Sequence, residues 1–171
     1  MAYLITQDTK RNIKVKKTTV TQLEQMVDHV YTAINGGTIE YAPAPNSTYV
    51  YYEFNSMISY GTDLASYGKF RLVYGPDTNN LTSIATDDVN YIAHFGGTNT
   101  NTTRKQKDTV PIKLVFIIPA WQGTKYLVLQ GLDDSEGAGD YYINGIRAEA
   151  KYPEEDDADD LFDPFVIVYS Y

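Results

Sequence analysis

The feature that most constrains the fold is an alternation of apolar and polar residues, which begins after Gly37 and recurs through the rest of the chain. Short segments rich in Tyr, Val, Ile and Phe show this two-residue period, and turn sequences such as Gly75-Pro76-Asp77 separate them. Because branched and aromatic side chains suit a pleated sheet, these segments predict strands. The predicted strands are Thr38–Tyr41, Thr48–Phe54, Lys69–Tyr74, Val89–Phe95, Ile112–Ile118, Lys125–Gln130, Tyr141–Tyr152 and Phe165–Tyr169.

The strongest turn signal in the chain is Asn144-Gly145. A type I′ turn needs positive φ at both central residues, and asparagine followed by glycine meets this requirement well. The signal divides the seventh segment, so it predicts a tight hairpin between Asp140–Ile143 and Ile146–Lys151.

One segment, residues 20–35, has helical spacing instead. Its apolar residues recur every three or four positions and would form one stripe along a helix; they are Val20, Leu23, Val27, Val30 and Ile34. Thr21-Gln22-Leu23-Glu24 fits a capping box, and Asn35-Gly36-Gly37 supplies a glycine of the kind that ends many helices. These residues predict one N-terminal amphipathic helix at about residues 20–35.

The predicted elements define a fold class. We expect a mainly β protein, an antiparallel β-sandwich or open barrel that carries this one helix. A length of 171 residues suits one domain, so residues 1–171 are expected to form a single β-rich domain. A domain of this size buries about 70% of the surface that its unfolded chain exposes, so it folds without disulfides or metals.

The N-terminal residues 1–17 are expected to form a basic hairpin. Its strands are residues 3–6 and 12–16, joined by a polar connection. Ile13 and Val15 would face one side and the intervening lysines the other, which is the alternation of a half-buried strand with a basic outer face.

Charge is concentrated at the two ends of a chain whose formal net charge is -8. Residues 1–17 carry five cationic side chains and one aspartate, whereas the acidic segment 153–163 carries seven carboxylates and no cation. Opposite charges favour head-to-tail pairing between copies, and the alternative is that both ends are solvated surface. The predicted contact residues are Lys14, Lys16 and Lys17 at one end and Asp156, Asp157 and Asp159 at the other.

The residue types present exclude several kinds of chemistry. The chain has no cysteine and only two histidines, His29 and His94, so thiol nucleophiles, cysteine-ligated zinc and histidine-rich metal sites are excluded. It contains no nucleophile elbow, phosphate-binding loop, dinucleotide fingerprint or zinc-protease motif. The acidic turn Asp133–Asp140 lacks the spacing of an EF-hand. We therefore expect no enzyme activity, no cofactor and no bound metal; a small carboxylate-based enzyme stays open as a third alternative.

Location and partners follow from similar arguments. The longest apolar run, Leu114–Ile118, is far shorter than the roughly 20 residues of a membrane helix, and the N-terminal apolar stretch, Tyr3–Ile5, is too short for a signal peptide. We expect a protein made in a cytoplasm, without membrane contact. The excess of negative charge also argues against nucleic acid as a partner.

Tyrosine is the one compositional extreme, with 16 residues. Tyrosine suits strands, and it also suits surfaces that are buried on binding, because it joins a large ring to a polar tip. Tyr49 and Tyr51 on one predicted strand, with Phe165 and Tyr169 on another, are therefore candidates for an assembly interface; ordinary sheet surface is the alternative.

The whole chain resembles an accessory structural protein of a tailed-bacteriophage virion. The resemblance lies in a short Met-Ala start, the lack of cysteine, abundant Asn, Thr and Tyr, and short strands joined by polar loops after a basic hairpin and one helix. It implies a non-enzymatic virion subunit that assembles symmetrically with itself and with other virion proteins, in a neck or tail ring or as a capsid accessory or decoration protein. The alternative is a β-sandwich carbohydrate-binding module in which Trp121 stacks on sugar rings.

Overall fold

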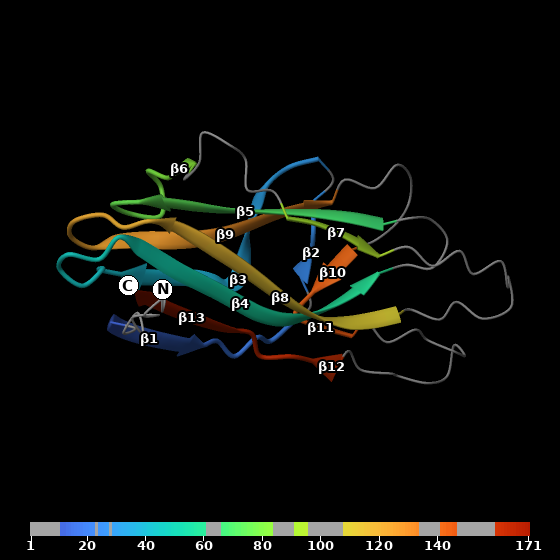
Figure 1. The fold of residues 1–171 in the computed structure, drawn as a ribbon. Coiled ribbons are helices and arrows are strands. Elements are labelled where there is room, and N and C mark those ends of the chain that lie inside the picture. The colour runs from blue at the N-terminus through green and yellow to red at the C-terminus, as the bar shows by residue number, and fades with distance from the viewer. Residues whose placement is uncertain are drawn as a thin grey trace, which may run out of the picture.

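The computed structural model describes residues 11–22, 24–27, 29–60, 66–83, 91–95, 108–133, 141–146 and 160–171 of the chain. These residues form thirteen β-strands and no helix, and the two larger sheets lie face to face (Figure 1). Every strand pair in them is antiparallel. The described residues therefore confirm the predicted mainly antiparallel β architecture, in the form of an open sandwich.

The first sheet is organised around β4, the strand Tyr49–Tyr60. β8 pairs along the whole of one edge of β4, from Tyr49 opposite Pro119 to Tyr60 opposite Asp108. β13 and β10 share the other edge, and β1 and β2 lie outside them. The bounds of these strands are β1 Arg11–Lys17, β2 Glu24–Gln25, β8 Asp108–Pro119, β10 Tyr141–Ile143 and β13 Phe165–Ser170.

The second sheet has the order β3-β9-β5, and both β6 and β7 pair with β5. Its strands are β3 Thr32–Tyr41, β5 Ser66–Gly75, β6 Thr82–Ser83, β7 Tyr91–Phe95 and β9 Lys125–Asp133. A separate short pair joins β11, Gly145–Ile146, to β12, Asp160–Leu161.

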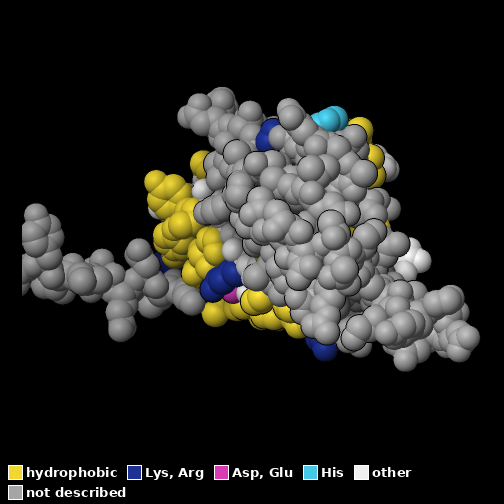
Figure 2. Space-filling model, turned by 90° about the vertical axis from the view of Figure 1, so that its right-hand side faces the viewer, with side chains coloured by type: hydrophobic (Ala, Val, Ile, Leu, Met, Phe, Trp, Pro, Cys, Tyr) yellow, Lys and Arg dark blue, Asp and Glu magenta, His cyan; other side chains and the backbone are white. Residues whose placement is uncertain are grey.

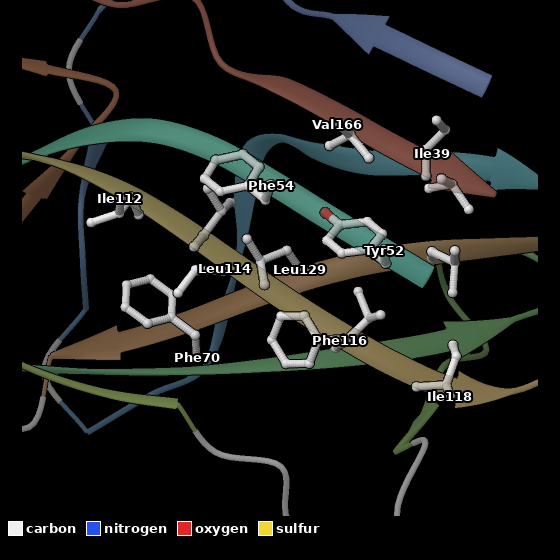
Figure 3. Packing of buried hydrophobic residues seen from close by; sticks show 14 of the residues in the cluster. Ile39, Tyr52, Phe54, Phe70, Ile112, Leu114, Phe116, Ile118, Leu129 and Val166 are labelled. Atoms are coloured by element: carbon white, nitrogen blue, oxygen red, sulfur yellow. The ribbon is translucent and has the colours of Figure 1, made fainter. Parts of the chain in front are cut away.

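The hydrophobic core fills the space between the two sheets. Successive side chains of a strand face opposite sides, so every second residue of β4 and β8 points inward. Figure 3 shows Tyr52 and Phe54 of β4 and Phe116 of β8 close to Leu129 of the second sheet. The hydroxyl of the fully buried Tyr52 donates to the carbonyl of Gly37 at 2.6 Å, which leaves no unpaired polar tip in the core.

The structure does not confirm the helix predicted over residues 20–35. Among the described residues of this range, 24–25 form β2 and 32–35 begin β3. Val27 and Val30, which belong to the expected apolar stripe, are 44% and 53% exposed. Gly36, at φ 81°, lies where the register between β3 and β9 shifts, and not at a helix end. Pairing with β9 therefore decides the conformation of a segment whose branched residues also suit a strand.

The tight hairpin predicted around Asn144-Gly145 is also wrong. β10 pairs with β4 and β2, whereas β11 pairs with β12, so the strands before and after Asn144 have different partners. Asn144 has the expected positive φ, 71°, but it is fully buried. Its side chain accepts a hydrogen bond from Ser56 Oγ at 2.8 Å and donates to the carbonyl of Asn35 at 3.1 Å. These bonds hold the turn in the core instead of at the surface.

Strand β1 agrees with the strand predicted at residues 12–16, but all of its residues are exposed, so neither face is buried as the alternation predicted. Ile13 and Val15, which a half-buried strand would cover, are 58% and 62% exposed. In the described residues β1 pairs with β13. The hairpin partner expected at residues 3–6 lies outside the described residues.

The lysines of β1 close one side of the sandwich. The ammonium groups of Lys14 and Lys16 donate to the backbone carbonyls of Glu40 and Thr38 in β3, at 2.7 and 2.9 Å. Among the described residues, β1 and β3 are edge strands of the first and the second sheet. Without the two lysines, the carbonyls of Thr38 and Glu40 on the edge of β3 would face solvent. The basic strand therefore protects the edge of the second sheet, where an unpaired edge invites aggregation.

Candidate assembly interface

The side chains of the first sheet that point away from the core form its outer face, on β1, β13, β4 and β8. The inward residues of β4 are Val50, Tyr52 and Phe54, so the residues between them face outward. The strand registers align these residues with outward residues of the neighbouring strands. The outer face consists of Ile13, Val15, Lys17, Tyr49, Tyr51, Glu53, Asn55, Met57, Pro111, Lys113, Val115, Ile117, Pro119, Phe165, Ile167 and Tyr169.

Tyrosine rings pack against one another across the outer face. Tyr51 of β4 lies opposite Tyr169 of β13, and their rings are stacked with centroids 4.6 Å apart. Tyr171 extends the group, with its ring centroid 5.8 Å from that of Tyr49 and 6.3 Å from that of Tyr169. Rings that already constrain one another lose little conformational entropy on binding, so they form a preformed contact surface.

A single carboxylate, Glu53, lies in the middle of this face, between β13 and β8. It accepts hydrogen bonds from the Tyr51 hydroxyl at 2.6 Å and the Asn55 amide at 3.0 Å, and it pairs with the Lys113 ammonium at 2.9 Å. Burial raises the pKa of Glu53, but these three partners together outweigh burial and hold the pKa below its ordinary value. The carboxylate is therefore ionised at neutral pH, and Lys113 balances its charge.

Large apolar side chains on both edges of the outer face are open to solvent. Besides Ile13 and Val15 on β1, Ile117 on β8 is 55% exposed and Tyr49 is 44% exposed. Figure 2 shows hydrophobic side chains gathered along the left and lower margins of the molecule, beside a small group of charged side chains. Isolated exposed apolar residues are ordinary, but a continuous group of them marks an interaction surface.

Four of the predicted interface residues lie together on this face. Tyr49 and Tyr51 come from β4, and Phe165 and Tyr169 come from β13, which pairs directly with β4. Phe165 is half-buried opposite Asn55, at the end of the face where β1 also ends. The strand pairing therefore brings these four residues to one surface, and their role as an assembly interface stays a prediction.

Lys17 and Asp163, one residue from each charged end of the chain, pair with each other within the chain. Lys17 forms an ion pair with Asp163 at 3.2 Å, and its strand β1 pairs with β13. The N–H of Val20, and then Lys17, lower the pKa of Asp163. The other two predicted lysines bind β3 as described above. Asp156, Asp157 and Asp159 lie outside the described residues, so their contact with a neighbouring copy stays a prediction.

Sequence alone did not predict Ile117, Glu53 and Lys113 as members of the surface. The available signal was the two-residue period of Ile112–Ile118, which places residues 113, 115 and 117 on one face. Which of the two faces is buried depends on the pairing of β8 with β4, and this pairing was not predictable from either strand alone.

Other features of the described residues add little chemistry. Within them, no group of three or more His, Cys, Asp or Glu side chains could hold a metal ion. No helix in this part of the chain is long and apolar enough to cross a membrane. No protein-family model matches the chain, and no curated protein matches its sequence. The functional argument therefore depends on the surface of the molecule.

Proposed function

We propose that this protein is a non-enzymatic structural subunit, which assembles by packing its outer face against another copy of the chain, as a component of a tailed-bacteriophage virion would. The observation that supports the proposal is the group of exposed apolar and aromatic side chains on β1, β4 and β8. Sheets that pack face to face through interdigitated side chains are a common way to bury such a group.

The charge of the outer face favours a second copy as the partner. The chain as a whole carries -8, so two copies repel one another over most of their surface. On the outer face the carboxylate of Glu53 is balanced by Lys113 at 2.9 Å, and Lys17 at the edge of the face is balanced by Asp163 at 3.2 Å. Two such faces meet without like-charge repulsion, and neither offers an excess charge that would select a strongly charged partner.

The size of the face indicates that one contact is weak and that many are needed. Four strands about 4.8 Å apart and roughly seven residues long, at about 3.4 Å each, cover roughly 450 Å². A stable pairwise interface buries about 800 Å² on each partner. When a subunit makes several such contacts, the first contact raises the effective concentration for the next, so the contacts together bind more tightly than one alone. This favours a ring or lattice over an isolated dimer.

The experiment compares the wild-type chain with Ile117→Glu, which places a carboxylate at an exposed edge of the outer face. Ala33→Glu is the matched control, because Ala33 is exposed on β3 of the other sheet. Sedimentation velocity over a range of concentrations measures the association, and negative-stain electron microscopy shows whether rings or lattices form.

We expect concentration-dependent oligomers for the wild type and for Ala33→Glu, and association at least tenfold weaker for Ile117→Glu. Burying a new charge in an apolar contact costs more than the contact gains, so the effect is expected to be large. A wild type that stays monomeric at all concentrations, or an Ile117→Glu variant that assembles normally, contradicts the proposal.

A further inference from the structure

A cavity of about 530 Å³ lies at one end of the sandwich, away from the centre of the outer face. It lies between the β3–β4 connection and the β8–β9 turn, which are near each other at the left of Figure 1. Its lining residues are Pro43, Ala44, Pro45, Asn46, Ser47, Ala120, Trp121, Gln122 and Gly123. Its volume is in the range of small-molecule binding sites, about 300–1,000 Å³.

The two loops that form the cavity are held in place by backbone hydrogen bonds. The N–H of Ala120 donates to the carbonyl of Thr48 at 3.0 Å, which joins one loop to the other. The N–H of Ala44 donates to Ser170 Oγ at 3.0 Å and so ties the first loop to β13. Asn46, at φ 63°, makes a left-handed turn between these contacts. The cavity is therefore preformed and does not need to be ordered by a ligand.

Trp121 supplies a fixed aromatic wall. Its ring stacks on that of Tyr74 with centroids 5.7 Å apart, and it meets the ring of Tyr41 edge-on at 6.2 Å. The ammonium of Lys125 lies beside this stack, 4.0 Å from the centroid of the Tyr74 ring and 5.9 Å from that of Trp121. A large ring with so many neighbours keeps one orientation, which suits a surface that recognises the shape of a ligand.

The polar groups around the cavity are neutral hydrogen-bonding groups. None of the nine lining residues is charged. Asn46 and Gln122 carry exposed amides, each able to donate and to accept. Two further polar atoms of lining residues, Ser47 Oγ and Trp121 Nε1, are buried without a hydrogen-bond partner in the described part of the chain. Such groups are rare in folded proteins and call for a specific explanation.

We infer that this cavity binds a neutral sugar ring, such as a pyranose unit of a glycan. The C–H face of a pyranose packs on an indole and on proline rings, while its hydroxyls pair with the exposed amides of Asn46 and Gln122. A charged ligand would find no opposite charge among the lining residues. The inference does not depend on the proposed assembly, because it concerns different residues.

The test uses the fact that Trp121 is the only tryptophan of the chain. Its fluorescence reports the cavity directly when the full-length protein is titrated with cellobiose, lactose, mannobiose or the N-acetylglucosamine dimer. Sialyllactose serves as the anionic probe and a Pro-x-x-Pro peptide as the protein-like probe. The titration is repeated with Ile117→Glu, so that a fluorescence change caused by assembly is recognised as such.

We expect at least one neutral disaccharide to shift the emission saturably, in the wild type and in Ile117→Glu alike. Binding should weaken about tenfold in Gln122→Ala and in Asn46→Gly, which keeps the left-handed turn, because each loses a hydrogen bond to the sugar. Gln22→Ala, which truncates a glutamine that is exposed and does not line the cavity, should bind as the wild type does. Circular dichroism confirms that each variant folds.

Three results overturn the inference. The first is that no neutral disaccharide changes the Trp121 emission up to its solubility limit. The second is that the shift persists unchanged in both cavity variants. The third is that the peptide or the anionic sugar binds while the neutral sugars do not, which assigns the cavity to a different ligand.

Discussion

Two glycines with nearly the same backbone conformation allow one steric contact to be measured. Gly36 has φ 81° and Gly123 has φ 79°, so replacing either by alanine forces a side chain into the left-handed region. A Cβ at Gly36 would collide with Pro164 Cγ and approach Thr18 Cβ at 3.3 Å. A Cβ at Gly123 would meet nothing within 4 Å. The difference between the two substitutions therefore isolates the packing between β3 and the segments beside β1 and β13.

The expected magnitudes follow from these contacts. The left-handed conformation costs an alanine about 1–2 kcal/mol, and this cost applies at both positions. Overpacking adds typically 1–3 kcal/mol, and it applies only at Gly36, where the ring of Pro164 cannot move without shifting β13. Gly36→Ala should therefore lower the free energy of unfolding by about 2–5 kcal/mol, and Gly123→Ala by about 1–2 kcal/mol.

Urea unfolding followed by far-UV circular dichroism measures both values. Both variants should keep the wild-type dependence of stability on urea concentration, since the surface exposed on unfolding is unchanged. If the two variants lose the same stability, β3 does not approach Pro164 as closely as described. If Gly36→Ala is harmless, the left-handed conformation of Gly36 is itself refuted.

Three further predictions concern buried polar groups and ion pairs. Asn144→Ala removes the hydrogen bonds to Ser56 and Asn35, so it should lower the unfolding free energy by about 2–4 kcal/mol in urea titrations. Ser56→Ala removes only one of them and should lower it by about half as much; equal losses would show that Asn144 does not bond to both Ser56 and Asn35. Glu53 has a lowered pKa in the folded state, so its ionised form stabilises the fold above the ordinary pKa of 4.5, and this contribution is lost as the pH falls through the lowered folded value. In urea titrations, the stability difference between wild type and Glu53→Gln should accordingly shrink as the pH is lowered from 6 to about 3. A difference that does not change with pH would contradict the ion pair between Glu53 and Lys113. Lys17→Gln breaks only an exposed pair with Asp163, so it should leave the urea midpoint of unfolding close to that of the wild type and leave the oligomers intact. Strong loss of assembly would show that the Lys17 ammonium contributes to the interface.

The strands were the most predictable part of the fold, because burial of one face imposes a two-residue period. The predicted Ile112–Ile118, Lys125–Gln130 and Phe165–Tyr169 lie within observed strands, and the predicted Thr48–Phe54 begins one residue before β4. The helix predicted for residues 20–35 was not confirmed, because a spacing of three and four residues between apolar side chains also arises where short strands and turns alternate. Only its pairing with β9 decides between the two, and that partner is distant in sequence.

The outer face was predictable in composition but not in arrangement. Tyrosines on both faces of Tyr49–Tyr52 indicated that one face was left for a partner. The direction of the lysines on β1 was not predictable, because it depends on the position of β3 at the neighbouring edge. The balance between Glu53 and Lys113 likewise depends on the register of β4 with β8.

The central place of β13 has a consequence for how the protein is made. β13 lies between β1 and β4, strands that precede it by most of the described chain, so β1 cannot join the first sheet before β13 has been synthesised. Such long-range strand pairs form slowly, because the chain loses the entropy of loop closure before the contacts between the strands stabilise it. The stack of Tyr51 on Tyr169 also needs both strands. A chain that ends before β13 therefore lacks both this stack and the pairing of β1, so under the proposed assembly it would bind its neighbours more weakly than the complete subunit does.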